Sequence, residues 1–321
     1  MTRRTHVVTG ATGLVGAALV LELATRFDDD IICLVRLGQG GAANRLTAAL
    51  TKAANAYNTE AATTNRALRL ATAIPADLTQ PGLGVNAADL KTAGSSVFWH
   101  VGALVGFSQA NRRRLFATNT AGTRRAVTLA AQLGADTFNY VSTAYVAGRS
   151  QGDIPERPIT DPVPREFYEA SKIAAERIVL HAPLPTCIFR PTAIVGHHTT
   201  LACGGPYIGI YGLMRRIAVH RTVRTRLEGG HHPIRLLAHP ELPINLVPVD
   251  HVAREMVDIA HSSTRLRIFH LSNPTPPTVG AILKAMFTQL GIPTYELVQR
   301  QDQLRPADNH LTELLREFYT G

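Results

Sequence analysis

A tyrosine and a lysine four residues apart, Tyr168 and Lys172, form the pair in this sequence best suited to proton transfer. They fall in a run of good helix formers, Phe167–Glu176. Residues four apart share one helical face, so the phenol and the ammonium should project into the same space. A nearby ammonium favours the phenolate and should lower the pKa of Tyr168 towards neutrality, which suits an acid/base group. The alternative is a chance pair on a solvated helix.

Two hydroxyl side chains, Ser142 and Thr143, directly follow the predicted strand Thr137–Val141. In an open parallel sheet, substrates gather at the carboxyl ends of the strands. There the hydroxyls could hold a carbonyl oxygen while Tyr168 protonates it. Taken without Tyr168, the Ser-Thr pair is typical of an ordinary turn after a strand.

A glycine-rich turn near the start of the chain predicts a dinucleotide site. The apolar run Thr5–Thr9 ends at three glycines, and a helical pattern of residues 14–26 follows. Gly10 permits a tight turn, Gly13 lets the backbone approach a pyrophosphate, and Gly16 allows close helix–strand packing. The anion would sit on the free N–H groups of the helix, with an ordinary strand–turn–helix as the alternative. The predicted contacts are Gly10, Thr12, Gly13, Leu14, Val15 and Gly16.

The residue after the second predicted strand indicates which dinucleotide binds. This strand is Ile31–Val35, and Arg36 follows it with no acidic residue before Glu60. An acidic residue at about this position binds the ribose 2′-hydroxyl when the cofactor is NAD. A guanidinium suits a 2′-phosphate instead, so we expect NADPH/NADP. Arg45 is either a second phosphate partner or a solvated helix residue.

Length and composition limit the class of protein. With 321 residues, of which 45% are hydrophobic, the chain fits one large α/β unit or a nucleotide domain plus a smaller lobe. No window approaches 18 unbroken apolar residues, so we expect no membrane span. The segment Met1–Arg4 runs into the first strand without a signal-peptide pattern, which favours a cytoplasmic protein.

Cysteine and histidine spacing argues against a metal site. The cysteines, Cys33, Cys187 and Cys203, lie far apart and are expected to be reduced and structural. The 13 histidines include the pairs His197–His198 and His231–His232. Adjacent histidines lack the four-residue helical spacing of a zinc site, and no acidic ligand is close to them in the sequence. We therefore predict no metal.

The formal charge of +9 favours acidic partners or anionic substrates. Neither a helix-turn-helix signature nor an aromatic-rich binding strand accompanies it, so we expect no nucleic acid. Part of the excess falls in one stretch, which is either a solvated face or a dock for a phosphate or an acidic carrier helix. Its arginines are Arg215, Arg216, Arg221, Arg224 and Arg226.

Strand and helix patterns alternate up to about residue 190, which predicts a parallel, doubly wound sheet. After the elements above, we expect helices at 42–54, 86–93, 111–133, 167–181, 250–260 and 279–290, and strands at 68–74, 96–99, 186–189, 244–249 and 266–271. Composition shifts after Arg190-Pro191. We therefore expect a Rossmann-type domain, residues 1–190 with about 244–272, and a smaller C-terminal substrate lobe, residues 191–243 and 273–321, over the carboxyl ends of the strands.

The G-x-x-G-x-x-G turn together with Tyr168-x-x-x-Lys172 resembles the extended branch of the short-chain dehydrogenase/reductases. The resemblance implies that Thr143, or Ser142 as second choice, is the catalytic hydroxyl, that Tyr168 is the proton donor, and that Lys172 lowers the tyrosine pKa and binds the nicotinamide ribose. Asn119 matches the Asn-x-x-Gly-Thr pattern, although it could simply bridge backbone groups. Further implied cofactor contacts are Asp77 and Leu78 at the adenine, Gly102 and Ala103 beside a ribose, and Pro191 and Thr192.

Several stretches look like the thioester reductases, the group that holds fatty acyl reductases and the terminal reductase domains of peptide synthetases. They are Cys33–Arg36, Val141–Gly148, Phe189–Gly196 and Asn245–Ala253. The chain departs from them in its shorter length and in Val101-Gly102-Ala103, where two alanines are usual. The resemblance implies a free-standing NADPH-dependent reductase of a coenzyme A- or carrier-bound acyl thioester, and a homodimer is compatible with it. The alternatives are a ketone reductase or alcohol dehydrogenase on a small natural product, and a non-catalytic NADP sensor.

Overall fold

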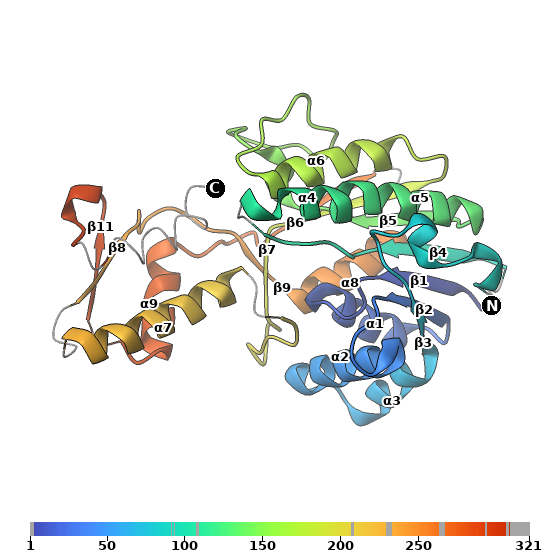
Figure 1. The fold of residues 1–321 in the computed structure, drawn as a ribbon, viewed down its shortest axis with the longest axis horizontal. Helices are drawn as coiled ribbons and strands as arrows, with labels where there is room; N and C mark the ends of the chain where they lie inside the picture. The colour runs from blue at the N-terminus through green and yellow to red at the C-terminus, as the bar shows by residue number, and fades with distance from the viewer. Residues whose placement is uncertain are drawn as a thin grey trace. The chain divides into compact units, whose positions relative to one another are not determined.

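The centre of the molecule is a seven-stranded sheet in which every strand pair is parallel (Figure 1). The computed structural model describes residues 3–90, 92, 94–106, 109–206, 209–228, 233–262, 267–292, 294–305 and 308. The strand order is β10-β6-β5-β4-β1-β2-β3, which confirms the predicted doubly wound α/β fold. The strands are β1 (Thr5–Thr9), β2 (Asp30–Val35), β3 (Ala71–Pro75), β4 (Ser96–His100), β5 (Thr137–Val141), β6 (Thr186–Pro191) and β10 (Ile268–Leu271).

The winding of the sheet reverses between β1 and β4. The chain runs outwards from β1 to β3 on one side, then returns to β4 and runs outwards on the other. At the carboxyl ends of this central pair, Thr9 lies opposite His100. Ligands of open α/β sheets bind outside the strand ends at such a reversal. The topology therefore marks the edge that follows Thr9 and His100 as the cofactor edge.

Helices cover both faces of the sheet (Figure 1). The strands are buried on both sides, which explains their nearly unbroken apolar runs. One face packs against α1 (Leu14–Arg26), α2 (Gly41–Tyr57), α3 (Ala61–Leu70) and α8 (Val249–Ala260). The other face packs against α5 (Gly122–Gln132) and α6 (Phe167–Leu180). Short helical segments are Pro81–Gly84, Ala87–Asp89, Gln109–Asn111, α4 (Arg112–Leu115), the π-helical Phe116–Ala121, Ala144–Ala147 and Gln301–Gln303.

Two predicted elements differ from the structure. Residues 68–70, predicted as the start of a strand, end helix α3, where Ala67 and Leu70 are buried one turn apart. Within the predicted helix 86–93, the described residues 86–90 and 92 include only the 3-10 turn Ala87–Asp89, in which the Ala88 amide donates to the Asn86 side chain. At residues 68–70 burial of the helical face outweighs residue propensity, and at the second place the chain leaves the turn because Leu90 is extended.

The chain forms two compact units, residues 1–206 with 247–272, and residues 207–246 with 273–321. Residues 191–206, which we expected in the substrate lobe, belong to the first unit. They include β7 (Ala193–Val195), which pairs with β9 (Leu246–Pro248). The placement of the second unit over the strand ends stays a prediction.

The second unit has its own apolar core, with Ile217, Leu236 and Phe287 fully buried. Its elements are α7 (Ile210–Glu228), β8 (Ile234–Leu237), α9 (Val279–Gln289) and β11 (Tyr295–Val298), and β8 pairs with β11 in parallel. The side chains of Arg221, Arg224 and Arg226, like His231–His232, lie outside the described residues. The predicted anion dock therefore stays a prediction.

Two composition-based expectations can be compared with the structure. Cys33 and Cys187 are buried, Cys203 is half-buried, and all three are free thiols. Burial raises the pKa of the Cys33 thiol to about 12, which makes it an inert core residue. Along the described part of the chain, no helix combines the length and the apolarity needed to cross a membrane.

Candidate active site

The turn after β1 brings the backbone unusually close to the turn after β4. Gly10 has φ +75°, and a Cβ placed on it would lie 2.6 Å from the amide nitrogen of Gly102. A Cβ on Gly16 would lie 2.1 Å from the carbonyl oxygen of Gly10, and the Gly13 amide donates to that same oxygen at 2.9 Å. Backbone atoms cannot yield as a flexible side chain can, so these positions require glycine.

The start of α1 fits a pyrophosphate. Gly13 is the residue before the helix, and no described side chain caps the N–H groups of the first turn. Those amides, from the turn that holds Thr12 to Val15, carry the positive end of the helix dipole. Gly102 is held beside them, because its amide donates to Thr9 Oγ1 at 3.1 Å and Leu78 packs over it. A dinucleotide's phosphates therefore fit at the cofactor edge.

The side chains beyond β2 and β3 form a charged group suited to the adenosine end. Arg36 is exposed, and Arg45 donates from Nη1 to its carbonyl oxygen at 2.9 Å. The amide and hydroxyl of Thr79 donate to the Asp77 carboxylate at 2.8 and 2.7 Å. The amide hydrogen bond, followed by the Thr79 hydroxyl and the Arg36 charge, lowers the pKa of Asp77 against the opposing effect of partial burial. Asp77 is therefore ionised beside Arg36 at neutral pH.

Thr143, Tyr168 and Lys172, the candidate triad, meet at the carboxyl end of β5. Thr143 immediately precedes the short helix Ala144–Ala147, and its hydroxyl accepts from the Tyr145 amide at 3.3 Å and hydrogen-bonds the Tyr168 phenol. Ser142 lies just before it, and its buried hydroxyl has no partner among the described residues. The Thr143 hydroxyl thus accompanies the phenol, and the Ser142 hydroxyl is buried one residue earlier in the chain.

The expected lowering of the Tyr168 pKa is wrong for this structure. Burial raises the pKa of Tyr168 well above its ordinary value, while the hydrogen bond from Thr143 partly offsets that rise. Lys172 is itself buried, which lowers the pKa of its ammonium from 10.5 to about 7. Its Nζ donates to the Val141 carbonyl at 2.7 Å and lies 4.3 Å from the centre of the Tyr140 ring. Removal from water therefore outweighs the i,i+4 pairing that suggested a phenolate.

Buried rings connect the candidate triad to the glycine turn. The Tyr140 ring, in contact with Lys172, stacks on His100 with 5.7 Å between ring centres. His100 hydrogen-bonds Thr9 at 2.8 Å and Thr123 at 3.0 Å through its two nitrogens. Burial, with the nearby Lys172 charge, lowers the pKa of His100 to about 3, so the ring is neutral. The cofactor edge and the candidate triad thus share one rigid core.

Comparison with known proteins identifies the family. The family model described as Male sterility protein, an NAD-binding family, matches residues 8–256, well over half of the chain. The chain belongs to this family of extended short-chain dehydrogenase/reductases. It is accordingly an oxidoreductase with a fold that binds a nicotinamide dinucleotide.

Individual relatives come from peptide and polyketide assembly. This family member is 35% identical over 209 residues to isonitrile lipopeptide synthase of Streptomyces coeruleorubidus, covering 60% of this chain and 13% of that protein. It is 30% identical over 294 residues to a linear gramicidin synthase of Brevibacillus parabrevis, covering 87% of this chain and 5% of that protein. The terminal R domain from the myxalamid PKS-NRPS biosynthetic pathway superposes with a TM-score of 0.75 at 26% identity, covering 98% of this chain and 79% of that one. The chain thus spans a small part of the two synthases.

Asn119 in this dehydrogenase/reductase holds loop and helix together. It lies in the π-helical segment Phe116–Ala121, and its side-chain oxygen accepts from the Leu104 amide at 2.7 Å. Its side-chain nitrogen donates to the Leu104 carbonyl at 2.9 Å and to Ser171 Oγ at 3.0 Å. The bridging role that we considered for Asn119 is therefore present, and it fixes the segment after Ala103 next to the residue preceding Lys172.

The sequence analysis missed a buried ion pair behind the candidate triad. Arg190, fully buried on β6, donates from Nε and Nη2 to Glu176 at 3.0 and 2.8 Å. Glu176 follows Lys172 by one helical turn, and its charge partly opposes the drop in the lysine pKa. An arginine within the apolar run of β6 was the available signal.

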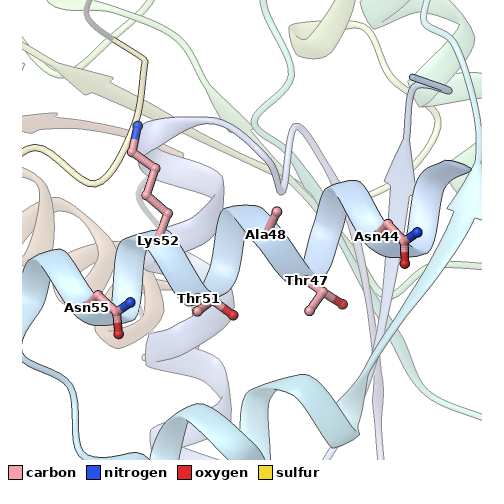
Figure 2. Close-up of a pocket in the computed structure, with 6 residues that line it drawn as sticks. All are labelled: Asn44, Thr47, Ala48, Thr51, Lys52 and Asn55. Atoms are coloured by element: carbon pink, nitrogen blue, oxygen red, sulfur yellow. The ribbon is translucent and has the colours of Figure 1, made fainter. Parts of the chain in front are cut away.

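The last two predicted cofactor contacts, Pro191 and Thr192, lie where strand β6 ends. Pro191 is the last residue of β6, and the Thr192 amide donates to the Leu271 carbonyl at 3.0 Å, which ties the strand exit to β10. A separate open depression runs along α2 (Figure 2). Its lining includes none of the predicted catalytic or cofactor residues and consists of Asn44, Thr47, Ala48, Thr51, Lys52 and Asn55.

Proposed function

We propose that this chain is an NADPH-dependent reductase of acyl thioesters, with Tyr168 as the proton donor. The observation that carries the proposal is the convergence of a buried, protonated phenol and two hydroxyls at the sheet end next to a glycine cradle suited to a dinucleotide. Membership of the extended dehydrogenase/reductase family and the similarity to synthase segments support the thioester as substrate.

In this proposal, the buried hydroxyls of Thr143 and Ser142 hold the thioester carbonyl oxygen. Bound NADPH supplies the hydride to the carbonyl carbon. As negative charge develops on the oxygen, the Tyr168 phenol delivers its proton to that atom. The resulting hemithioacetal expels the thiol and leaves an aldehyde. The raised pKa of Tyr168 keeps the phenol protonated at neutral pH, which is the form that a proton donor needs.

Lys172 has a positioning and binding role in the proposal. Its ammonium lies under the strand exit, bound to the Val141 carbonyl, one residue before Ser142. A lysine ammonium has three N–H donors, of which the Val141 carbonyl takes one, so donors remain for a ligand's hydroxyl groups. We assign it the ribose hydroxyls of the nicotinamide end.

Arg36 supports NADPH over NADH. Arg36 is exposed, Arg45 donates to its backbone carbonyl, and the Asp77 carboxylate, which feels the Arg36 charge, already accepts from Thr79. A guanidinium favours a 2′-phosphate through charge-assisted hydrogen bonds, and Arg36 and Arg45 each carry one. An aldehyde is the expected first product, and further reduction to the alcohol would use a second NADPH.

The experiment follows nicotinamide absorbance and free thiol together, with acyl-CoA, acyl-carrier and ketone substrates. The proposal expects NADPH consumption that depends on a thioester, with one thiol released per NADPH for the aldehyde or one per two NADPH for the alcohol. Consumption with ketones but not with thioesters would establish the alternative ketone reductase. Cofactor binding without turnover on any substrate would favour an NADP sensor.

A further inference from the structure

Three histidines surround one carboxylate oxygen of Asp250, and none of these four residues belongs to the predicted active site. His197 and His198 follow β7, while Asp250 and His251 lie in the first turn of α8. Asp250 Oδ2 lies 2.5 Å from His198 Nδ1, 3.9 Å from His197 Nε2 and 3.8 Å from His251 Nε2. His197, His198 and Asp250 each offer one potential ligand atom, and these three atoms lie within 4.8 Å of one another. The prediction of no metal considered neighbours in sequence only, and Asp250 is distant from both histidines there.

Further contacts, within the cluster and with Tyr57, hold these side chains in place. The other carboxylate oxygen of Asp250, Oδ1, accepts from the His198 amide at 2.9 Å, which fixes the carboxylate with Oδ2 towards the rings. The His197 ring stacks on Tyr57 with 5.3 Å between ring centres, and the His198 and His251 rings are 4.8 Å apart. Such supporting contacts orient metal ligands in known sites.

We propose that His197, His198 and Asp250 bind a divalent transition-metal ion of the Zn²⁺ type, with His251 or a water as the fourth ligand. Imidazole nitrogen and carboxylate oxygen are its usual ligands, at bond lengths of about 2.0–2.2 Å. A tetrahedral ion with such bonds separates its ligand atoms by roughly 3.3–3.5 Å. The distances from Asp250 Oδ2 to the two histidines, 2.5 and 3.9 Å, bracket that value, and all three ligand atoms lie within 4.8 Å of one another, so side-chain rotations that move these atoms by about 1 Å bring them to the spacing of a tetrahedral site.

Binding replaces hydrogen bonds that the cluster makes with itself. The ion takes the place of the hydrogen between His198 Nδ1 and Asp250 Oδ2. His197 Nδ1 accepts from the amides of Thr199 and Thr200 at 3.2 and 3.4 Å, so coordination through Nε2 moves the ring proton to Nδ1 and gives up these contacts. Both are near the distance limit of a hydrogen bond, and their loss costs little beside metal–ligand bonds.

The ion would anchor the segment that leads from this cluster to the glycine turn. Downstream of His198, Thr200 Oγ1 donates to the Ala56 carbonyl at 2.8 Å. Lys52 extends from α2 (Figure 2), and its Nζ donates to the Gly205 carbonyl at 3.0 Å. A Cβ on Gly205 would lie 2.7 Å from Leu14 Cβ, at the first residue of α1. An ion bound at the start of the segment 197–206 would therefore stabilise the packing of this segment against α2, α8 and the start of α1.

The test uses chelator-treated chain without a polyhistidine tag, titrated with Zn²⁺ by calorimetry and with Co²⁺ by visible spectroscopy. We expect one ion per chain, a Co²⁺ spectrum of tetrahedral type and a thermal midpoint that rises with Zn²⁺. Asp250→Asn and His198→Ala should each weaken binding by at least roughly 10–100-fold. His239→Ala, which removes an exposed histidine outside the cluster, should leave the affinity unchanged.

Three results would overturn the proposal. They are the absence of Co²⁺ ligand-field bands in the unaltered chain, unchanged affinity in both cluster variants, and an equal loss in the His239→Ala control. The Co²⁺ spectrum of the unaltered chain decides the matter even if the variants fold poorly. The readouts are independent of reductase turnover, so failure of the proposed function leaves this test intact.

Discussion

The glycine turn after β1 and the candidate triad after β5 lie at the ends of strands of one sheet, but different forces determine them. At the turn, backbone meets backbone: a Cβ on Gly16 would lie 2.1 Å from the Gly10 carbonyl oxygen. At the triad, burial controls chemistry by raising the pKa of Tyr168 and lowering that of Lys172 to about 7. A steric requirement can be recognised from the residue type, here glycine, whereas the charge state of a side chain depends on its burial in the whole fold.

Tyr168→Phe should produce the largest effect, because it removes the proposed proton without disturbing the turn. We expect turnover to fall roughly 10²–10⁴-fold, the scale of a positioned acid. Dissociation constants for NADPH should stay as they were. Tyr295→Phe serves as the control, since its ring packs on Phe287 in the second unit. Near-normal turnover of the Tyr168 variant would remove this residue from the mechanism.

Gly16→Ala tests the steric side of the comparison. The added methyl group overlaps the Gly10 carbonyl, so the free energy of unfolding should fall by about 3 kcal/mol, with loss of dinucleotide binding. Gly134→Ala is the matched control: it has φ +63° but open space around it, and should cost only about 1–2 kcal/mol of strain. Denaturant titration measures both. Equal losses would show that the close approach is unimportant.

Arg36→Ala should change cofactor preference more than stability. Loss of a charge-assisted hydrogen bond to the 2′-phosphate should weaken NADPH binding by about 1.5–3 kcal/mol and leave NADH binding unchanged. Arg69→Ala, at an exposed position on α3, is the control. Fluorescence titration of both cofactors gives the constants. Equal affinities for NADPH and NADH in the unaltered protein would contradict the assignment.

Lys172→Met should flatten the pH dependence of stability. Because folding lowers the lysine pKa from 10.5 to about 7, the unfolded chain binds more protons between these pH values. The free energy of unfolding of the unaltered protein should therefore rise with pH in this window, by at most about 1.4 kcal/mol per unit. Urea unfolding between about pH 7 and pH 9 checks the slope. The control Lys284→Met, at an exposed position, should keep the slope of the unaltered protein. An unchanged slope in Lys172→Met would show that the lowered pKa of Lys172 is not its cause.

Much of the fold could be predicted from the sequence, since its signals are local. The apolar run before Gly10 and the helical pattern from Leu14 to Arg26 coincide with β1 and α1. A prediction failed in the segment 86–93, where Asn86 caps the start of a turn but the backbone is already extended at Leu90. The boundary of the two units also differed, because β7 pairs with a strand about 50 residues later in the sequence.

The candidate site was less predictable, because its chemistry depends on distant neighbours. Spacing placed Tyr168 near Thr143, but the sign of the tyrosine pKa shift follows from burial that no spacing reveals. Arg190 with Glu176, and the convergence of Asp250 on His198, join segments far apart in sequence. Such pairs become visible only when the topology brings their strands and helices together.

The ionisation of Tyr168 tests the central claim most directly. Ultraviolet titration of tyrosinate, taken as the difference between the unaltered protein and Tyr168→Phe, isolates this phenol from the other tyrosines. In cofactor-free protein, burial predicts no difference signal between about pH 6 and pH 10, the range below an ordinary tyrosine pKa. A phenolate that appears near neutral pH would contradict the account and restore the pairing with Lys172 as the dominant influence.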